Sequence, residues 1–100
     1  MREYELYLII DATADEEAVA SIRDRVTQLI STGHSGEAGE VIKFEPRGKR
    51  RLTFPIKGRV ESQDLVVTFH TPQQALRELE RVLKLDEQVL RHLIVRKDED

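Results

Sequence analysis

The cations between residues 43 and 59 are the part of the sequence with the clearest chemistry. This basic stretch has a formal charge of +6, because seven Lys and Arg residues face the single acid Glu45. The rest of the chain has 9 basic and 18 acidic residues, and the total charge is −3. Guanidinium and ammonium groups bind phosphate oxygens, so a basic strip on an acidic body indicates a phosphate-binding surface. A solvated loop with a basic bias is the alternative. The cations are Lys43, Arg47, Lys49, Arg50, Arg51, Lys57 and Arg59.

No other set of side chains has the spacing of a catalytic or metal site. His34, His70 and His92 form neither an HxH nor an HExxH pattern, and the lack of cysteine excludes a thiol nucleophile, a thiolate metal site and a disulfide. The acids at 15–17 suit a helix start, where the helix dipole favours negative charge. Residues 33–39, GHSGEAG, lack the spacing of a phosphate-binding loop. We therefore predict no enzyme activity, no metal and no cofactor.

Length and hydropathy limit how the chain is organised. A chain of 100 residues and 11.6 kDa corresponds to one domain with one modest core. No apolar run approaches the roughly 20 residues of a membrane span, and no leader precedes the first expected strand. We expect a single soluble, cytoplasmic domain over residues 1–97 and a short acidic tail at 98–100, with neither a membrane nor a small-molecule substrate as partner.

Hydrophobic periodicity predicts the elements that position these side chains. Every second residue of 4–10, YELYLII, is apolar on one face, which predicts a strand. Residues 13–32 have apolar side chains at three-to-four spacing and predict an amphipathic helix. Thr13 and Glu16 have the spacing of a capping box, and the helix is expected to end near Gly33.

The basic stretch lies within a long strand expected at 40–56. Pro46 and Gly48 predict an interruption of this strand, and Pro55 predicts its end. The apolar side chains at 42 and 44, and again at 52, 54 and 56, alternate along the chain. We therefore expect each set to share one face, with Phe54 in the core.

The second half of the chain repeats the pattern of a strand, a helix and a strand. Residues 64–70 alternate, and residues 71–85 predict a second amphipathic helix with Thr71 as its cap and Pro72 at its first position. Residues 89–97 predict the last strand.

The resulting order, β-α-β-β-α-β, predicts the fold class. It indicates an α+β ferredoxin-like sandwich, in which a four-stranded antiparallel sheet carries two helices on one face. Tyr7 and Ile9 are apolar residues on the other face of the first strand. They indicate that something covers this open face or an edge of the sheet, although scattered exposed apolar residues are also common.

The sequence resembles the bacterial small-subunit ribosomal protein family numbered six. The resemblance runs from Met1 to about Lys97 and rests on the order of elements, the opening MREYELYLII, the central RGKRRLTFPI and the closing LDEQVLRHLIVRK. Its most specific part is the pattern G-[KR]-R-x-L-x-[YF]-P-I, which residues 48–56 match.

This resemblance implies a non-enzymatic structural constituent of the small ribosomal subunit. Members of the family pair with the small-subunit ribosomal protein numbered eighteen, and the pair binds the central domain of small-subunit ribosomal RNA. By that analogy the partner covers the apolar open surface, and the protein is cytoplasmic and ribosome-associated. The candidate RNA-binding residues are Arg2, Tyr4, Arg47, Lys49, Arg50, Arg51 and Arg91.

Two other functions have the same order of elements. A self-associating ferredoxin-like regulatory or interaction module would pair its apolar sheet face with a second copy and would not bind RNA. An independent RNA-recognition-motif protein would need an aromatic-rich third strand, and DLVVTFH at 64–70 does not supply one.

Overall fold

The computed structural model describes residues 1–97, and the acidic tail expected at 98–100 lies outside them. The elements follow the predicted order of strand, helix, strand, strand, helix and strand. Their bounds are β1 Arg2–Asp11, α1 Glu16–Thr32, β2 Glu40–Ile56, β3 Arg59–Thr71, the 3-10 turn η1 Gln73–Ala75, α2 Leu76–Leu85 and β4 Val89–Arg96.

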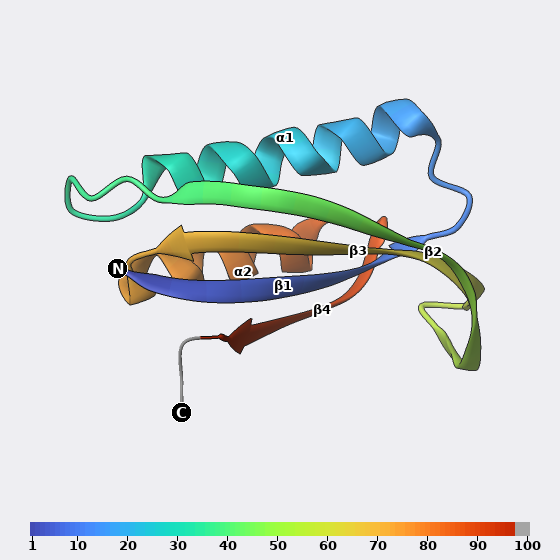
Figure 1. The fold of residues 1–100 in the computed structure, drawn as a ribbon. Coiled ribbons are helices and arrows are strands. Elements are labelled where there is room, and N and C mark those ends of the chain that lie inside the picture. The colour runs from blue at the N-terminus through green and yellow to red at the C-terminus, as the bar shows by residue number, and fades with distance from the viewer. Residues whose placement is uncertain (98–100) are drawn as a thin grey trace.

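The strands form one antiparallel sheet in the order β2-β3-β1-β4 (Figure 1). β1 therefore lies in the interior of the sheet, paired with β3 on one side and β4 on the other. Both helices contribute to a single hydrophobic core with the same face of β1 and β3. The predicted ferredoxin-like sandwich is confirmed.

The core forms where strand alternation meets the apolar stripes of the two helices. In β1 the even-numbered residues from Tyr4 to Ile10 are buried on the helix side, and in β3 Phe69 is fully buried. Three residues of α1 and two of α2 pack on them because apolar residues recur at three-to-four spacing. These helix residues are Ile22, Val26, Ile30, Leu79 and Leu83.

The helix ends differ in part from the capping predicted by the sequence. Asp15, rather than Thr13, caps α1, because its Oδ1 accepts a hydrogen bond from the backbone N–H of Ala18 at 2.8 Å. Thr13 instead donates to the carboxylate of Asp11. The predicted end at Gly33 is confirmed, and this glycine has φ of 66°, which favours a residue without a Cβ.

Thr71 is also not the helix cap that the sequence predicted. It is the last residue of β3, and the chain passes through Pro72 and η1 before α2 begins without a side-chain cap. The hydroxyl of Thr71 is buried and has no hydrogen-bond partner among the described residues. The reason is that β3 runs on to pair Thr71 with Arg2 of β1, which keeps Thr71 inside the sheet.

β2 is irregular, and one of its irregularities reverses the expected side-chain faces. The predicted break between Pro46 and Gly48 is present as a register shift. A second shift between Val41 and Lys43 turns Ile42 outward, although the sequence placed it on one face with Phe44. Val41 and Phe44 pack against the core instead.

The end of the β2–β3 hairpin extends past the sandwich. β1 pairs with β3 only as far as Ser62, so the part of the hairpin between Arg51 and Glu61 has no third strand beside it (Figure 1). Phe54, which alternation placed in the core, is 76% exposed, and Leu52 is only half-buried. Alternation assigned these side chains to a face, but no helix or strand covers that face here.

Candidate nucleic-acid interface

An ion pair beside the turn of the β2–β3 hairpin anchors the hairpin to the sheet. Nε of Arg59 lies 2.9 Å from Oδ2 of Asp11, whose side chain is only 9% exposed. Oδ1 of Asp11 accepts hydrogen bonds from the backbone N–H and the hydroxyl of Thr13, at 3.0 and 2.9 Å. The Thr13 N–H above all, together with Arg59, holds the pKa of Asp11 below its usual range. Arg59 therefore stabilises the fold.

Three more cations of the basic stretch have partners within the protein. Nε of Arg50 lies 2.9 Å from the carboxylate of Asp64, and Nζ of Lys43 lies 3.4 Å from that of Glu45. Nζ of Lys57 donates to the backbone carbonyl of Val89 at 3.1 Å, which ties the hairpin turn to the start of β4. These contacts reduce the positive charge that the stretch offers to a ligand.

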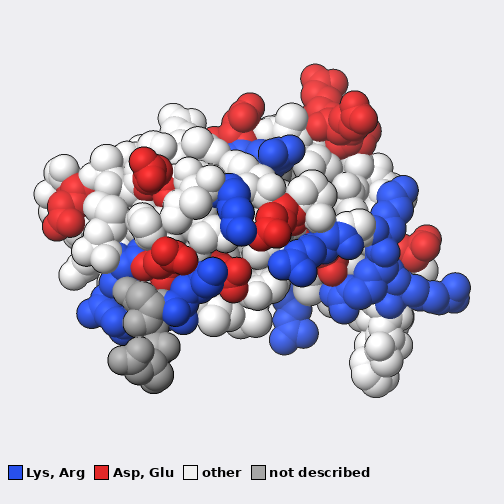
Figure 2. Space-filling model, viewed as in Figure 1, with Lys and Arg blue, Asp and Glu red and all other residues white. Residues whose placement is uncertain are grey.

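Arg47, Lys49 and Arg51 are the cations of the stretch that remain available. All three are exposed, and none has an ion pair within residues 1–97. Figure 2 shows Lys and Arg gathered over the hairpin end of β2 and β3. No acid occurs between Glu45 and Glu61, so the hairpin segment itself contributes only positive charge at this end of the molecule.

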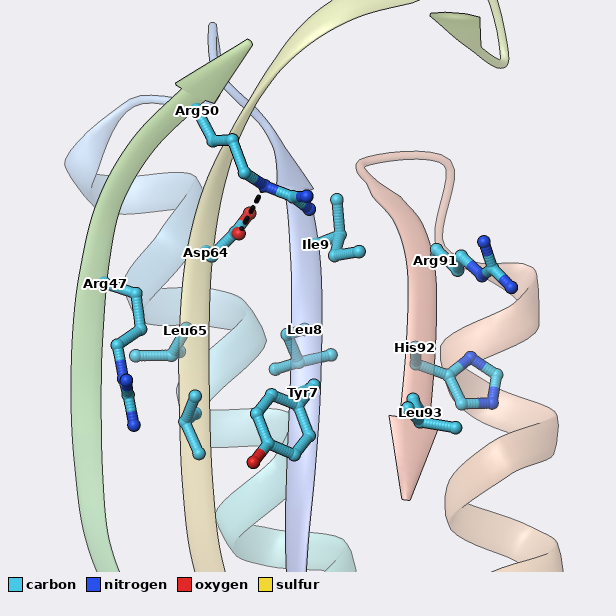
Figure 3. A pocket seen from close by; sticks show the side chains of 11 residues that line it. Tyr7, Leu8, Ile9, Arg47, Arg50, Asp64, Leu65, Arg91, His92 and Leu93 are labelled. Carbon is cyan, nitrogen blue, oxygen red and sulfur yellow. Dashed lines mark ion pairs between the residues drawn. The ribbon is translucent and has the colours of Figure 1, made fainter. Parts of the chain in front are cut away.

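The sheet face opposite the helices contains a groove of about 770 Å³. Its floor is apolar and is made of Tyr7 and Ile9 from β1, Val66 from β3 and Leu93 from β4. Arg47 and Arg50 lie on its β2 side and Arg91 on its β4 side, so all four strands contribute side chains (Figure 3). The sequence-based expectation of apolar residues on this face is confirmed, and Leu93 is 59% exposed.

The other end of the open face carries a network around two acids. Glu3 lies 2.9 Å from Nε2 of His70 and 3.6 Å from Nζ of Lys97. The hydrogen bond with His70 lowers the pKa of Glu3. The hydroxyl of Tyr7 donates to Glu5 at 3.1 Å, and this bond raises the pKa of Tyr7. The open face is therefore cationic toward the hairpin and mixed in charge at its far end.

The structure brings some of the predicted site residues together and separates others. Arg47, Arg50 and Arg91 border the groove, and Lys49 and Arg51 lie on the hairpin. Arg2 begins β1, at the far end of the sheet, and a ten-residue strand places it roughly 30 Å from the hairpin side. The predicted residues thus form one group at the hairpin and groove, with Arg2 apart.

The expectation that Tyr4 contacts RNA needs correction. Its side chain is 4% exposed and stacks on Phe69, with ring centroids 5.6 Å apart. Tyr4 lies on the helix side of β1, so its ring is part of the core and has no face for a base.

Leu93 as part of the groove and Phe54 as a surface residue were not predicted from the sequence. Strand alternation signals Leu93, because it shares the parity of Arg91 in β4. For Phe54 the only signal is its position within the acid-free segment 46–60. Only the sheet register assigns Leu93 to the face of Tyr7, which is its partner across the β1–β4 ladder.

Residues 1–97 contain no group of three His, Cys, Asp or Glu side chains arranged to hold a metal ion. No helix of this described part is long and apolar enough to cross a membrane.

The fold is an α+β ferredoxin-like sandwich that displays a cationic hairpin and an apolar sheet face. The sequence model of the ribosomal protein S6 family matches residues 3–96. Small ribosomal subunit protein bS6 of Heliobacterium modesticaldum is 35% identical over 99% of both chains. The bS6 protein of Corynebacterium urealyticum is 37% identical over 98% of this chain and 99% of its own.

A solved structure shows the same fold. The 30S ribosomal protein S6 from Thermotoga maritima superposes with a TM-score of 0.83 at 28% identity, over 96% of this chain and 87% of that chain. The chain belongs to the ribosomal protein S6 family, as the sequence resemblance predicted. It is therefore a structural constituent of the small ribosomal subunit, and it is a cytoplasmic, ribosome-associated protein of translation.

Proposed function

We propose that this protein binds the central domain of small-subunit ribosomal RNA as a pair with the small-subunit ribosomal protein numbered eighteen, and that it catalyses no reaction. Membership of the S6 family supports the ribosomal setting. The observation that carries the proposal is the presence of two surfaces of different chemistry, a cationic hairpin and an apolar groove, with Arg47 at the border of both. One surface suits RNA and the other suits a protein.

The hairpin supplies contacts to the RNA backbone. Arg47, Lys49 and Arg51 are exposed and lack ion pairs within the described residues, so phosphate groups can replace their water without breaking a contact of the fold. Arg50 and Arg91 add positive charge at the groove, and Arg2 adds a separate contact at the far end of β1. Cations of this kind read the shape and backbone of folded RNA, so sequence specificity comes from the RNA fold and the partner.

The groove supplies the protein contact. The apolar surface formed by half-buried Tyr7 and Ile9 and exposed Leu93 contributes to stability only when another surface covers it, at about 25 cal/mol per Å² of apolar area removed from water. Its cationic borders, Arg47 and Arg91, bring the bound partner next to the same RNA that the hairpin contacts. Simultaneous contact with one RNA then makes binding of the two proteins cooperative.

The test measures binding to a central-domain RNA fragment at several salt concentrations, with and without the partner protein, and measures the oligomeric state of the free protein. We expect weak, salt-sensitive binding alone and tighter binding with the partner. A stable dimer of this protein that ignores RNA in both conditions would refute the proposal, and it would support the self-associating module instead.

A further inference from the structure

Phe54 is the most exposed large apolar side chain of residues 1–97, at 76%. It lies in the part of the hairpin that extends past β1, where neither a helix nor a third strand is present to pack on it. Burial of a Phe side chain stabilises a protein by about 1.5 to 3 kcal/mol, and this residue forgoes that contribution in the isolated chain. An aromatic side chain displayed in this way is typical of a contact surface.

The charges around Phe54 indicate what it contacts. Arg51 lies three residues before Phe54, roughly 10 Å away along an extended strand. The long Arg51 side chain can reach part of the way toward Phe54. Lys57 follows three residues after Phe54, and the sequence from 46 to 60 contains no acid. An apolar protein surface placed on Phe54 would have to remove water from these cations without pairing them. RNA instead offers a base for the ring and phosphates for the cations, so charge complementarity favours RNA.

The turn that follows Phe54 is held in place before any ligand binds. The turn residues Lys57 and Gly58 both have positive φ, 51° and 77°, which suits a tight two-residue connection between antiparallel strands. Arg59 is fixed to Asp11, and Lys57 is fixed to the carbonyl of Val89. Phe54 lies within the register shift between Arg51 and Ile56, so the anchored turn that follows it is what limits the conformational entropy lost when a base stacks on the ring.

We propose that Phe54 is a stacking platform for one unpaired nucleobase of RNA, with Arg51 and Lys49 binding the phosphates next to that base. This inference rests on the proposed RNA-binding function and adds the residue and the mode of contact. It predicts a preference for single-stranded or bulged RNA over a continuous duplex, in which no base face is available.

The chain contains no Trp, so the F54W variant carries a single indole reporter at the proposed site. We expect its fluorescence to be quenched by a single-stranded oligoadenylate of about ten nucleotides at low salt, because stacking brings the base onto the indole. The same RNA should bind F54A about 5- to 150-fold more weakly than the parent, the range measured for loss of one stacked base. F54L should lose nearly as much, since Leu keeps apolar bulk but has no aromatic face.

Leu85→Ala is the matched control, because Leu85 is similarly exposed, at 71%, and ends α2 rather than the hairpin. It should bind the RNA like the parent. Circular dichroism and thermal melting of every variant confirm that the fold is kept, as the exposure of Phe54 predicts.

Four results would overturn the inference. If the parent binds no RNA even at low salt, the proposed function and the stacking site fail together. If the parent binds but F54A binds equally well and F54W is not quenched, only the stacking site fails. Retained affinity in F54L with loss in F54A, or an F54A defect limited to binding of the partner protein, would assign Phe54 to an apolar contact instead of a base.

Discussion

Replacing single cations of the hairpin tests whether the ion pairs of the structure persist when RNA binds. Each phosphate neutralised on single-stranded nucleic acid changes the slope of log affinity against log salt by about 0.7. If all seven cations between Lys43 and Arg59 met phosphates, the slope from this stretch would be about −5. Within residues 1–97, Arg47, Lys49 and Arg51 are the cations of the stretch without a partner, so we expect the stretch to contribute about −2.

The two slopes give clearly different affinities. Between 50 and 200 mM salt a slope of about −2 weakens binding about 20-fold, whereas a slope of about −5 weakens it about 900-fold. The assay is fluorescence anisotropy with a labelled central-domain RNA fragment at four or more salt concentrations. K49A and R51A should each flatten the slope by about 0.7 relative to the parent, because each removes one phosphate contact.

R59A is the matched control for this experiment. It removes the same charge from the same hairpin, but Arg59 is paired with Asp11, so the slope should not change while thermal stability falls. A flattening by R59A equal to that by R51A would refute the reasoning, because it would mean that the internal ion pairs open when RNA binds.

Three further substitutions test the fold and the groove. Asp11→Ala should destabilise the protein by about 2 kcal/mol, because it removes charge-assisted hydrogen bonds from Thr13 and Arg59. Since the pKa of Asp11 is lowered from 3.8 in the folded state, this stabilisation is present above pH 3.8 and is lost as pH falls through the folded pKa. Urea unfolding of parent and variant between pH 7 and pH 2 checks both points. Equal stability of the two proteins at pH 7 would contradict the first point, and an equal difference at every pH would contradict the second. Phe69→Ala should cost about 3 to 5 kcal/mol in the same assay, since Phe69 is fully buried against Tyr4. A cost below about 1 kcal/mol would show that this part of the core is misplaced. Leu93→Asp should leave the melting temperature nearly unchanged but weaken binding of the partner protein at least 10-fold, because Leu93 is exposed on the groove floor. Unchanged partner affinity, measured by calorimetry, would exclude the groove as the protein contact.

The aromatic residues Tyr4 and Phe54 show the limit of predicting side-chain burial from the sequence. Alternation placed Phe54 in the core, and Tyr4 was a candidate for RNA contact, but Phe54 is 76% exposed and Tyr4 is 4% exposed. Side-chain alternation has a period of two, so it separates the faces of a strand without showing which face another layer covers. The helices cover Tyr4, while β2 runs past the end of β1 and leaves Phe54 uncovered.

The basic stretch shows the same limit for predicting which charged side chains are free to bind a ligand. Its composition indicated a phosphate-binding surface from the sequence alone, but a count of charges cannot tell a free cation from a paired one. The partner of Arg59 lies 48 residues earlier in the chain, at Asp11, and Val89 lies 32 residues after Lys57. Such contacts exist only after the sheet has brought distant strand ends together.

The sequence by itself determined the order of elements, the ferredoxin-like class, the family and the location of the cationic segment, because hydrophobic periodicity, glycine and proline positions and a contiguous motif are local properties. The tertiary structure alone decided which cations are available, that Tyr7, Ile9, Val66 and Leu93 form one groove, and that Phe54 faces water. These properties depend on strand register and on which layers meet, and both are set by packing between segments far apart in the chain.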